Sequence, residues 1–201
     1  KLTQKQHFEA RGLPIADFQT LDDEADFDSV CARWVNFITK SRTGGYDGRG
    51  NQVQTGQAWH EVLDHFYELY GPDAQLYAER TVKLQKELSV IVARTLDGAT
   101  LAYPVVETIH KDNICDIVLA PAPIDPSFSD DAEDIARQAV ESFDGAGVFA
   151  VEMFLDEGDN LLINEVAPRV HNSGHHTIDA NATSQFEQHI KSYSWPATWK
   201  Y

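Results

Sequence analysis

The chain has 201 residues, of which 42% are apolar and 24% are charged, a composition typical of a globular protein with one substantial core or two small ones. Its 16 lysines and arginines stand against 32 aspartates and glutamates, which gives a formal net charge of −16 at pH 7. This charge argues against duplex nucleic acid or an anionic membrane surface as a partner, and no apolar run approaches the roughly 20 residues that span a bilayer.

A helical pattern opens the chain at Lys1, which is not a methionine, so we expect a cut through a longer protein. The pattern ends at residues 12–14, because glycine suits a helix C-terminus and proline cannot continue the helix. A second helix is predicted over roughly 26–35, and a β-rich segment follows at 37–39. Residues 51–54 form a returning strand in this interpretation, so the glycine-rich stretch before them joins two strands.

The rest of the chain alternates helical and extended patterns. Residues 58–70 carry apolar side chains at helical spacing, and another helix is predicted to start at a capping Ser129 and to end at Phe143. A last helix begins near Thr183. Strands are predicted at residues 76–78, 87–94, 100–107, 113–120, 147–155 and 160–166. We therefore expect an α+β fold in two lobes, with a hinge near residues 79–83.

Four glycines lie between residues 44 and 50. Glycine permits positive φ angles and lets backbone N–H groups close on an anion. The stretch lacks the Gly-Lys-Ser/Thr ending of a Walker loop, and no helix follows it. An ordinary hairpin loop is the alternative, but Lys40, Arg42 and Arg49 form a basic cluster in an acidic chain, which favours a flap over phosphates.

Two glutamates are predicted to face each other on the last two strands. A turn centred between Gly158 and Asp159 places Glu152 opposite Glu165, and alternation then puts these two on one face with Val148, Ala150, Phe154, Leu161 and Ile163. Facing carboxylates among apolar neighbours need a proton or a shared cation, and oxygen ligands without thiolates favour Mg²⁺ over zinc. A slipped register that exposes one glutamate is the alternative. Asn164 joins the pair only if the strand has a bulge.

A polar segment with three histidines in six residues, His171 to His176, follows the second of these strands. No helix supplies i, i+4 spacing and no cysteine assists, so a histidine metal site is not favoured. Arg169 with Asn172 and Ser173 is typical of a clamp for an anion beside the metal. The alternative is a polar loop whose histidines cap neighbouring strands.

Three stretches carry a resemblance to a known family: KSRTGGYDGRGN at 40–51, YPVVETIHKDNIC at 103–115 and INEVAPRVHNSGH at 163–175. They resemble the ATP-grasp ligases, and among these the N5-carboxyaminoimidazole ribonucleotide synthetase family. The middle stretch is most similar to the fungal phosphoribosylaminoimidazole carboxylases, in which this unit is fused to a mutase domain. The likeness runs over roughly residues 1–190 and continues through TSQFE at 183–187. It covers the central portion of that family, without its N-terminal nucleotide-fold domain and its C-terminal portion.

The resemblance implies an ATP-grasp fold, α+β in two lobes, with ATP held between two antiparallel sheets. Residues 1–80 would be the lid subdomain with the phosphate loop, 81–191 the core subdomain with magnesium and substrate loops, and 192–201 a divergent tail. Lys40 would hold the α/β phosphates, backbone groups of 79–82 the adenine, and Glu87 the ribose hydroxyls. The implied ATP-binding set is Lys1, Lys40, Gly45, Tyr46, Asp47, Gly48, Arg49, Gly50, Asn51, Glu79, Arg80, Thr81, Val82, Glu87, His110, Asn164 and Glu165.

The resemblance also implies a reaction, the ATP- and Mg²⁺-dependent carboxylation of 5-aminoimidazole ribonucleotide by bicarbonate through carboxyphosphate. Glu152 and Glu165 would bind the metal. The implied substrate-binding residues are Arg169, His171, Asn172 and Ser173. The implied catalytic residues are Tyr46, Asp47, Arg49 and Arg169.

The expected partners are these small molecules, with neither nucleic acid nor membrane, and the family pattern allows a homodimer and a fused or separate mutase. Cys31 and Cys115 lie far apart without Cys-x-x-Cys spacing, which fits reduced thiols in a cytoplasmic protein. Two alternative functions stand beside the ligase. One is a truncated nucleotide-binding module that does not catalyse, and the other is an ATP-grasp ligase with a different acceptor.

Overall fold

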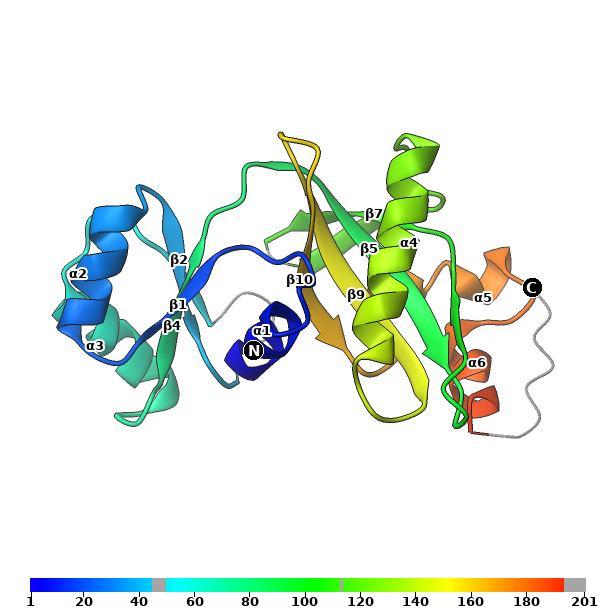
Figure 1. Ribbon diagram of the computed structural model, residues 1–201, viewed down its shortest axis with the longest axis horizontal. Coiled ribbons are helices and arrows are strands. Elements are labelled where there is room, and N and C mark those ends of the chain that lie inside the picture. Colours follow the sequence, from blue (N-terminus) through cyan, green and yellow to red (C-terminus); the bar gives the residue numbers. More distant parts are fainter. Residues whose placement is uncertain (45–49, 113, 194–201) are drawn as a thin grey trace. The chain divides into compact units, whose positions relative to one another are not determined.

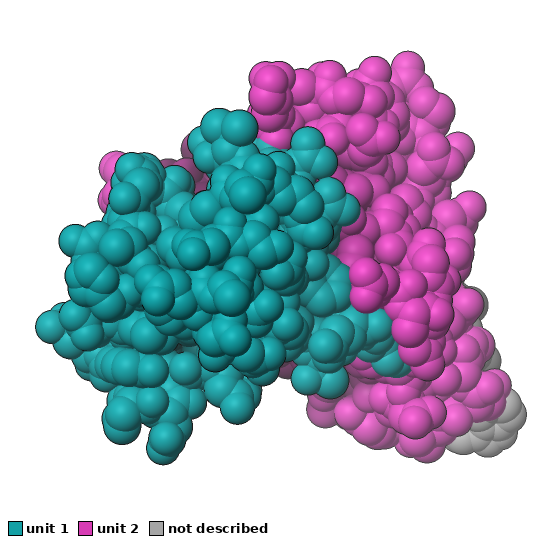
Figure 2. All heavy atoms as spheres, turned by 60° about the vertical axis from the view of Figure 1, so that its left-hand side comes forward, with its two compact units in different colours: residues 1–7, 16–82 teal, residues 8–15, 83–201 magenta. Residues whose placement is uncertain are grey.

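The computed structural model describes residues 1–44, 50–112 and 114–193 (Figure 1). The chain divides into two compact units, which Figure 2 colours separately. Unit 1 comprises residues 1–7 and 16–82, and unit 2 comprises residues 8–15 and 83–201. Each unit contains an antiparallel sheet and helices, which confirms the predicted α+β class. None of the helices in the described ranges is long and apolar enough to cross a membrane.

Within its described residues, unit 1 has a four-stranded antiparallel sheet in the order β1-β4-β2-β3. These strands are β1 (Phe18–Leu21), β2 (Phe37–Ser41), β3 (Asn51–Val53) and β4 (Leu76–Arg80). Helix α1 (Leu2–Glu9) begins in unit 1 and ends in unit 2, and helices α2 (Glu24–Arg33) and α3 (Trp59–Tyr70) lie in unit 1. The last two helices pack on the sheet through a core that includes Phe27, Val30, Val62, Phe66 and Leu76. β4, in the middle of the sheet, therefore has a buried environment.

The predicted pairing around the glycine-rich stretch is confirmed, because β2 and β3 pair antiparallel and Lys40 lies opposite Asn51. The second helix begins at Glu24, earlier than expected, since the Asp23 carboxylate accepts a hydrogen bond of 2.9 Å from the Asp26 amide and caps it there. The sequence analysis missed β1, a four-residue strand with one buried side chain, Leu21.

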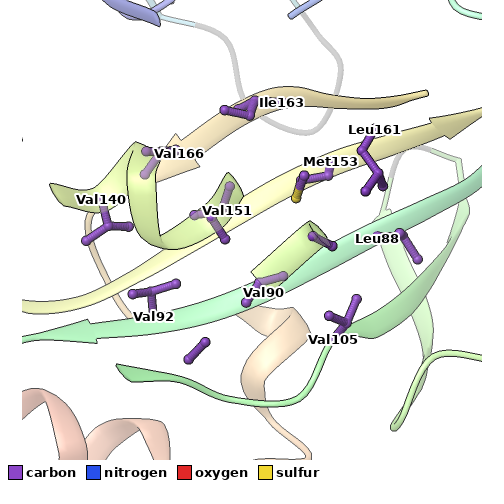
Figure 3. Packing of buried hydrophobic residues seen from close by; sticks show 14 of the residues in the cluster. Leu88, Val90, Val92, Val105, Val140, Val151, Met153, Leu161, Ile163 and Val166 are labelled. Atoms are coloured by element: carbon purple, nitrogen blue, oxygen red, sulfur yellow. The ribbon is translucent and has the colours of Figure 1, made fainter. Parts of the chain in front are cut away.

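The described part of unit 2 has a six-stranded sheet in the order β10-β9-β5-β7-β8, with β6 also paired to β5. The strands are β5 (Leu84–Arg94), β6 (Thr100–Ala102), β7 (Val106–Lys111), β8 (Ile114–Leu119), β9 (Gly147–Asp156) and β10 (Leu161–Ala167). Helix α4 (Pro126–Glu141) covers one face of the sheet over β5 and β9 (Figure 1). Figure 3 shows the core between them, where Val90, Val151 and Met153 pack together with Val140 of the helix.

Two elements of unit 2 differ from the prediction. The single strand expected at 100–107 is two strands, because Pro104 lies between β6 and β7 and proline cannot donate a ladder hydrogen bond. Helix α4 begins at Pro126 rather than after Ser129. Its cap is Asp125, whose carboxylate accepts a hydrogen bond of 2.9 Å from the Ser127 amide.

The polar segment after β10 is more ordered than the expected loop. It contains a 3₁₀ helix, η1 (Asn172–Gly174), and a one-turn helix, α5 (Thr177–Ala180). The last described helix, α6 (Gln185–Lys191), starts after Ser184, whose hydroxyl accepts a hydrogen bond from the Glu187 amide. This start agrees with the predicted position near Thr183.

Candidate functional site

The predicted opposition of Glu152 and Glu165 is confirmed, but the turn alone does not produce it. From the hairpin, Leu161 pairs with Leu155 and Ile163 with Met153, a register one residue away from the predicted one. A β-bulge between Ile163 and Glu165 then shifts the pairing, so that Glu165 lies opposite Glu152. In this sequence the opposition of the two carboxylates therefore results from the bulge and not from the turn alone.

Because of this bulge, the predicted face is wrong for two residues of β10. Leu161 and Ile163 do not share a face with the glutamates; they lie in the main core with Met153, as Figure 3 shows. Val148 and Ala150 pack in a separate cluster on the face opposite to this core, which is the face predicted for them together with Glu152. Because Ile163 pairs with Met153 before the bulge, it shares the face of Met153 rather than that of Glu152.

Asn164, the extra residue of the bulge, reaches Glu152. Its side-chain Nδ2 donates a hydrogen bond of 3.4 Å to Oε2 of Glu152. The sequence predicted that Asn164 joins the two glutamates only if the strand has a bulge, and the structure contains this bulge. Two consecutive polar residues of one strand, Asn164 and Glu165, serve the same site.

His171 is the second partner of Glu152. Its Nε2 lies 3.1 Å from Oε1 of that carboxylate. The amide of Ser173 donates to Nδ1 of His171 at 3.4 Å, and an amide can only donate, so the ring proton sits on Nε2 and points to Glu152. Burial raises the pKa of Glu152, but its interactions with His171, His110 and Asn164 outweigh this effect and lower that pKa. Glu152 is therefore a carboxylate at neutral pH.

A buried hydrogen-bond chain contacts His171 at Nδ1, the ring nitrogen that does not face Glu152. The Ser173 hydroxyl lies 2.9 Å from Nδ1 of His171 and 2.7 Å from the hydroxyl of Ser89, and both serines are fully buried. The backbone of His171 is also held, since its N–H donates to Oε1 of Gln185 at 2.9 Å and its carbonyl accepts from Nε2 at 2.7 Å. The sequence analysis missed Ser89 and Gln185; the one available signal was the inclusion of Gln185 in the similar stretch at 183–187.

Glu87 and His110, both expected to contact the nucleotide, lie together on neighbouring strands. Nδ1 of His110 is 2.5 Å from Oε2 of Glu87. The hydrogen bond to Glu87 raises the pKa of His110 against the opposing effect of burial, and the charges of Glu87 and Glu152 add to the rise. The protonated imidazole is thus favoured by the negative charges of Glu87 and Glu152.

In unit 1, Lys40 and Glu79 form an ion pair of 2.9 Å between Nζ and Oε1, and both side chains are buried. A third residue that the sequence analysis did not identify, Lys5, lies 3.1 Å from the other oxygen of Glu79. The exposed Arg80 pairs with Asp17 at 3.3 Å, and the Thr81 amide donates to the Asn36 carbonyl. Val82 is half-buried.

The remaining predicted residues are placed as follows. The Lys1 amino group donates to the Arg42 carbonyl at 3.1 Å, and the Gly50 carbonyl accepts from the Ser41 amide at 3.0 Å. Arg169 and Asn172 are exposed, and the Arg169 guanidinium donates to the neighbouring Val170 carbonyl. Outside the described residues lie Gly45, Tyr46, Asp47, Gly48 and Arg49.

The oxygen ligands of unit 2 fit Mg²⁺ better than a transition metal. Among the described residues, no three or more His, Cys, Asp and Glu side chains are grouped so as to hold a metal ion. Mg²⁺ does not need such a cage, because it is usually bound by one or two carboxylates and completes its shell with waters and substrate phosphates. Glu152 and Glu165, opposite each other beside Asn164, provide two such carboxylates.

Comparison with known proteins confirms the resemblance. The ATP-grasp domain model matches residues 6–186. Phosphoribosylaminoimidazole carboxylase of Saccharomyces cerevisiae is 44% identical over 195 residues, which are 96% of this chain and 34% of that protein. N5-carboxyaminoimidazole ribonucleotide synthase of Synechococcus elongatus is 39% identical over 193 residues, 96% of this chain and 48% of that protein.

Solved structures agree with the sequence comparison. A carboxyaminoimidazole ribonucleotide synthase from Aspergillus clavatus, complexed with ATP, matches with a TM-score of 0.88 and 40% identity over 98% of this chain and 52% of that one. The chain spans about a third of the fungal carboxylases and about half of the synthase structures that it matches. Because the domain model covers most of the residues and the fold agrees, the chain belongs to the ATP-grasp family.

Proposed function

We propose that the chain is the ATP-grasp part of an enzyme that carboxylates 5-aminoimidazole ribonucleotide with bicarbonate, ATP and Mg²⁺, as in purine biosynthesis. The observation that carries the proposal is the β10 bulge, which brings Asn164 and Glu165 to Glu152 beside His171. The names of the relatives support it, and the Aspergillus clavatus enzyme has also been solved with ADP and 5-aminoimidazole ribonucleotide, with a TM-score of 0.83 and 37% identity.

The proposed reaction has two steps. A bicarbonate oxygen attacks the γ-phosphorus of ATP, ADP leaves, and carboxyphosphate forms. The exocyclic amine of the ribonucleotide then takes up the carboxyl carbon, directly or as released CO₂, and inorganic phosphate and a proton leave. Because the substrates carry the reactive groups, the protein must mainly neutralise charge, orient the reactants and exclude water.

The nucleotide residues are assigned within each unit. In unit 1, which we take as the lid subdomain, Lys40 would contact the α/β phosphates, backbone groups of 79–82 the adenine, and residues 45–51 would cover the phosphates. In unit 2, which we take as the core subdomain, Glu87 would accept from the ribose hydroxyls. The contact between His110 and Glu87, 2.5 Å, supports this role because it holds the carboxylate in one orientation. Residues 192–201 stay assigned to a divergent tail.

Glu152 and Glu165 would hold Mg²⁺, with Asn164 beside them. The bound ion would supply charge neutralisation on the transferred phosphoryl group. His171 supports this role, because its Nε2–H donates to one oxygen of Glu152 and keeps the carboxylate ionised and oriented. The other oxygen of Glu152 accepts from Asn164, which fixes the plane of the carboxylate.

The substrate side is assigned to the segment after β10. The exposed guanidinium of Arg169 and the exposed Asn172 would bind the anionic groups of bicarbonate and the ribonucleotide. Ser173 is fully buried and its hydroxyl is engaged by Ser89 and His171, so its contribution is to orient His171. Tyr46, Asp47 and Arg49 complete the proposed catalytic set.

Further assignments rest on the relatives and on chemistry. Cys31 and Cys115 are free thiols, which supports a reducing, cytoplasmic location. The fungal relatives support a fused mutase domain as partner, and a homodimer is also consistent with the family.

The test is the release of inorganic phosphate from Mg-ATP, measured with and without bicarbonate and with and without 5-aminoimidazole ribonucleotide. Release that requires bicarbonate and rises with the ribonucleotide supports the proposal. Phosphate release that requires bicarbonate but does not change when the ribonucleotide is added would indicate a ligase with another acceptor. Nucleotide binding without any release would identify a binding module that needs the rest of the protein for catalysis, and would contradict the activity proposed for this chain.

A further inference from the structure

Three charged side chains meet inside unit 1. Glu79 lies on the central strand β4 opposite Ile38 of β2, and Lys40 lies two residues further along β2, so Glu79 and Lys40 are diagonal neighbours on one face. Oε1 of Glu79 is 2.9 Å from Nζ of Lys40, and Oε2 is 3.1 Å from Nζ of Lys5. The contact between Lys5 and Oε2 is close enough for an ion pair, but among the described residues Oε2 accepts no hydrogen bond of standard geometry. One carboxylate thus joins two lysines.

The three groups carry a surplus positive charge in a buried place. The exposed fractions of the side chains are 4% for Lys5, 10% for Lys40 and 3% for Glu79. Burial raises the pKa of Glu79, but the charges of Lys40 and Lys5 outweigh it and lower that pKa, so the carboxylate is ionised. Two ammonium groups and one carboxylate leave a net charge of +1. Within these three groups two ammonium groups share one carboxylate, so Glu79 alone does not cancel the charge of Lys40.

The two lysines are not equivalent. Lys40 is the more accessible one and is the lysine proposed to contact the nucleotide phosphates. If Glu79 had Lys40 as its one partner, the pair would be neutral and would attract an anion weakly. Lys5, which is almost fully buried, provides the second positive charge and compensates Glu79. The sequence analysis gave no role to Lys5.

We propose that Lys5 is a positioning residue for nucleotide binding: it neutralises Glu79, so that Glu79 fixes the place of Lys40 without cancelling its charge toward the polyphosphate. The inference rests on the proposed function, in which Lys40 binds the phosphates. Lys5 acts through Glu79 and does not contact the nucleotide.

The test is the affinity of the chain for Mg-ADP, measured by isothermal titration calorimetry. We expect Lys5→Met to weaken binding by roughly tenfold, because Glu79 then cancels the charge of Lys40 toward the polyphosphate and the effective dielectric constant of such a site is only about 20. The double variant Lys5→Met/Glu79→Gln should regain most of this loss, because Lys40 then faces no carboxylate. Lys5→Arg should bind as the unsubstituted chain does. A merely structural role of Lys5 predicts the opposite for the double variant, namely a further loss.

Lys191→Met is the matched control, because it removes the same charge from an exposed pair with Glu187. It should change the affinity by less than about twofold, since exposed charges are screened. Urea unfolding of each variant shows whether it is folded; if Lys5→Met does not fold, the double variant and Lys5→Arg carry the comparison. Unchanged affinity of Lys5→Met, or no recovery in the double variant, overturns the inference alone. Failure of the unsubstituted chain to bind Mg-ADP overturns the proposed nucleotide site, and this inference with it.

Discussion

Substitution of Gly174 by alanine should release His171 from its place beside Glu152. An added Cβ at this position would lie 2.5 Å from Oε1 and 2.7 Å from Cδ of Gln185. Distances this short force Gln185 to move, and Gln185 is fully buried and has little free space. Its amide makes both backbone hydrogen bonds to His171, so the movement breaks the support of that residue.

The size of the effect follows from these two hydrogen bonds. A buried backbone group that loses its partner costs about 1–3 kcal/mol, and the lower half of this range applies to each of the two partly buried backbone groups of His171. We therefore expect Gly174→Ala to lower the free energy of unfolding by about 2–4 kcal/mol. Guanidinium unfolding measures this change, and phosphate release should fall in the same variant because Glu152 loses its oriented partner.

Two further variants make the reasoning refutable. Gly158→Ala is the control: its added Cβ would meet the exposed Asn160 and the half-buried Asp156 at 3.0 and 3.3 Å, at side-chain ends that can move, so we expect a loss below about 1 kcal/mol. Gln185→Ala removes the side-chain amide with which the Cβ of an alanine at position 174 would clash. The double variant Gly174→Ala/Gln185→Ala should then be no less stable than Gln185→Ala alone. Additive losses would show that the contact with Gln185 is not the cause.

Other predictions concern the carboxylates. Glu152→Gln and Glu165→Gln should each lower Mg²⁺-dependent phosphate release at least about a hundredfold while circular dichroism stays unchanged, because each removes a carboxylate proposed to hold the metal. The control variant Glu157→Gln, in the same hairpin, should leave phosphate release unchanged. Normal turnover of Glu152→Gln and Glu165→Gln would contradict the metal assignment. His110 should also give a pH-dependent stability, because its pKa is raised by Glu87. The stabilisation is complete below the unfolded pKa of about 6.5 and is lost as pH rises through the raised value, so the difference in unfolding midpoint between the unsubstituted chain and Glu87→Gln should shrink from pH 6 to pH 9. A difference independent of pH would rule this linkage out.

Elements with a clear apolar period were predictable from the sequence. Helix α3 was expected because Val62 and Phe66 recur at helical spacing, and both are fully buried. The two strands of the β9–β10 hairpin were placed within one residue of their bounds. Strand β1 was missed because it has four residues and shows no alternation, so its existence depends on pairing with β4.

The candidate site was predictable only in part. Residue types and order indicated the glutamate pair, but a bulge depends on the packing on both sides of the strand and has no fixed sequence signal. Lys5 contacts Glu79 within unit 1, and Ser89 and Gln185 support His171 within unit 2, so their side chains acquire a role only through tertiary contacts. Such contacts cannot be read from local patterns, because each joins segments far apart in the chain.

The bulge in β10 also separates the apolar residues of the core from the polar residues of the candidate site. In a regular strand, Ile163 and Val166 would point to opposite faces, yet both lie in the main core of unit 2. The extra residue between them restores the apolar period while two polar neighbours, Asn164 and Glu165, stay on the other side. The packing of the hydrophobic layer therefore does not require the polar pair, and deletion of Asn164 should keep both the pairing of Val166 with Val151 and a folded sheet.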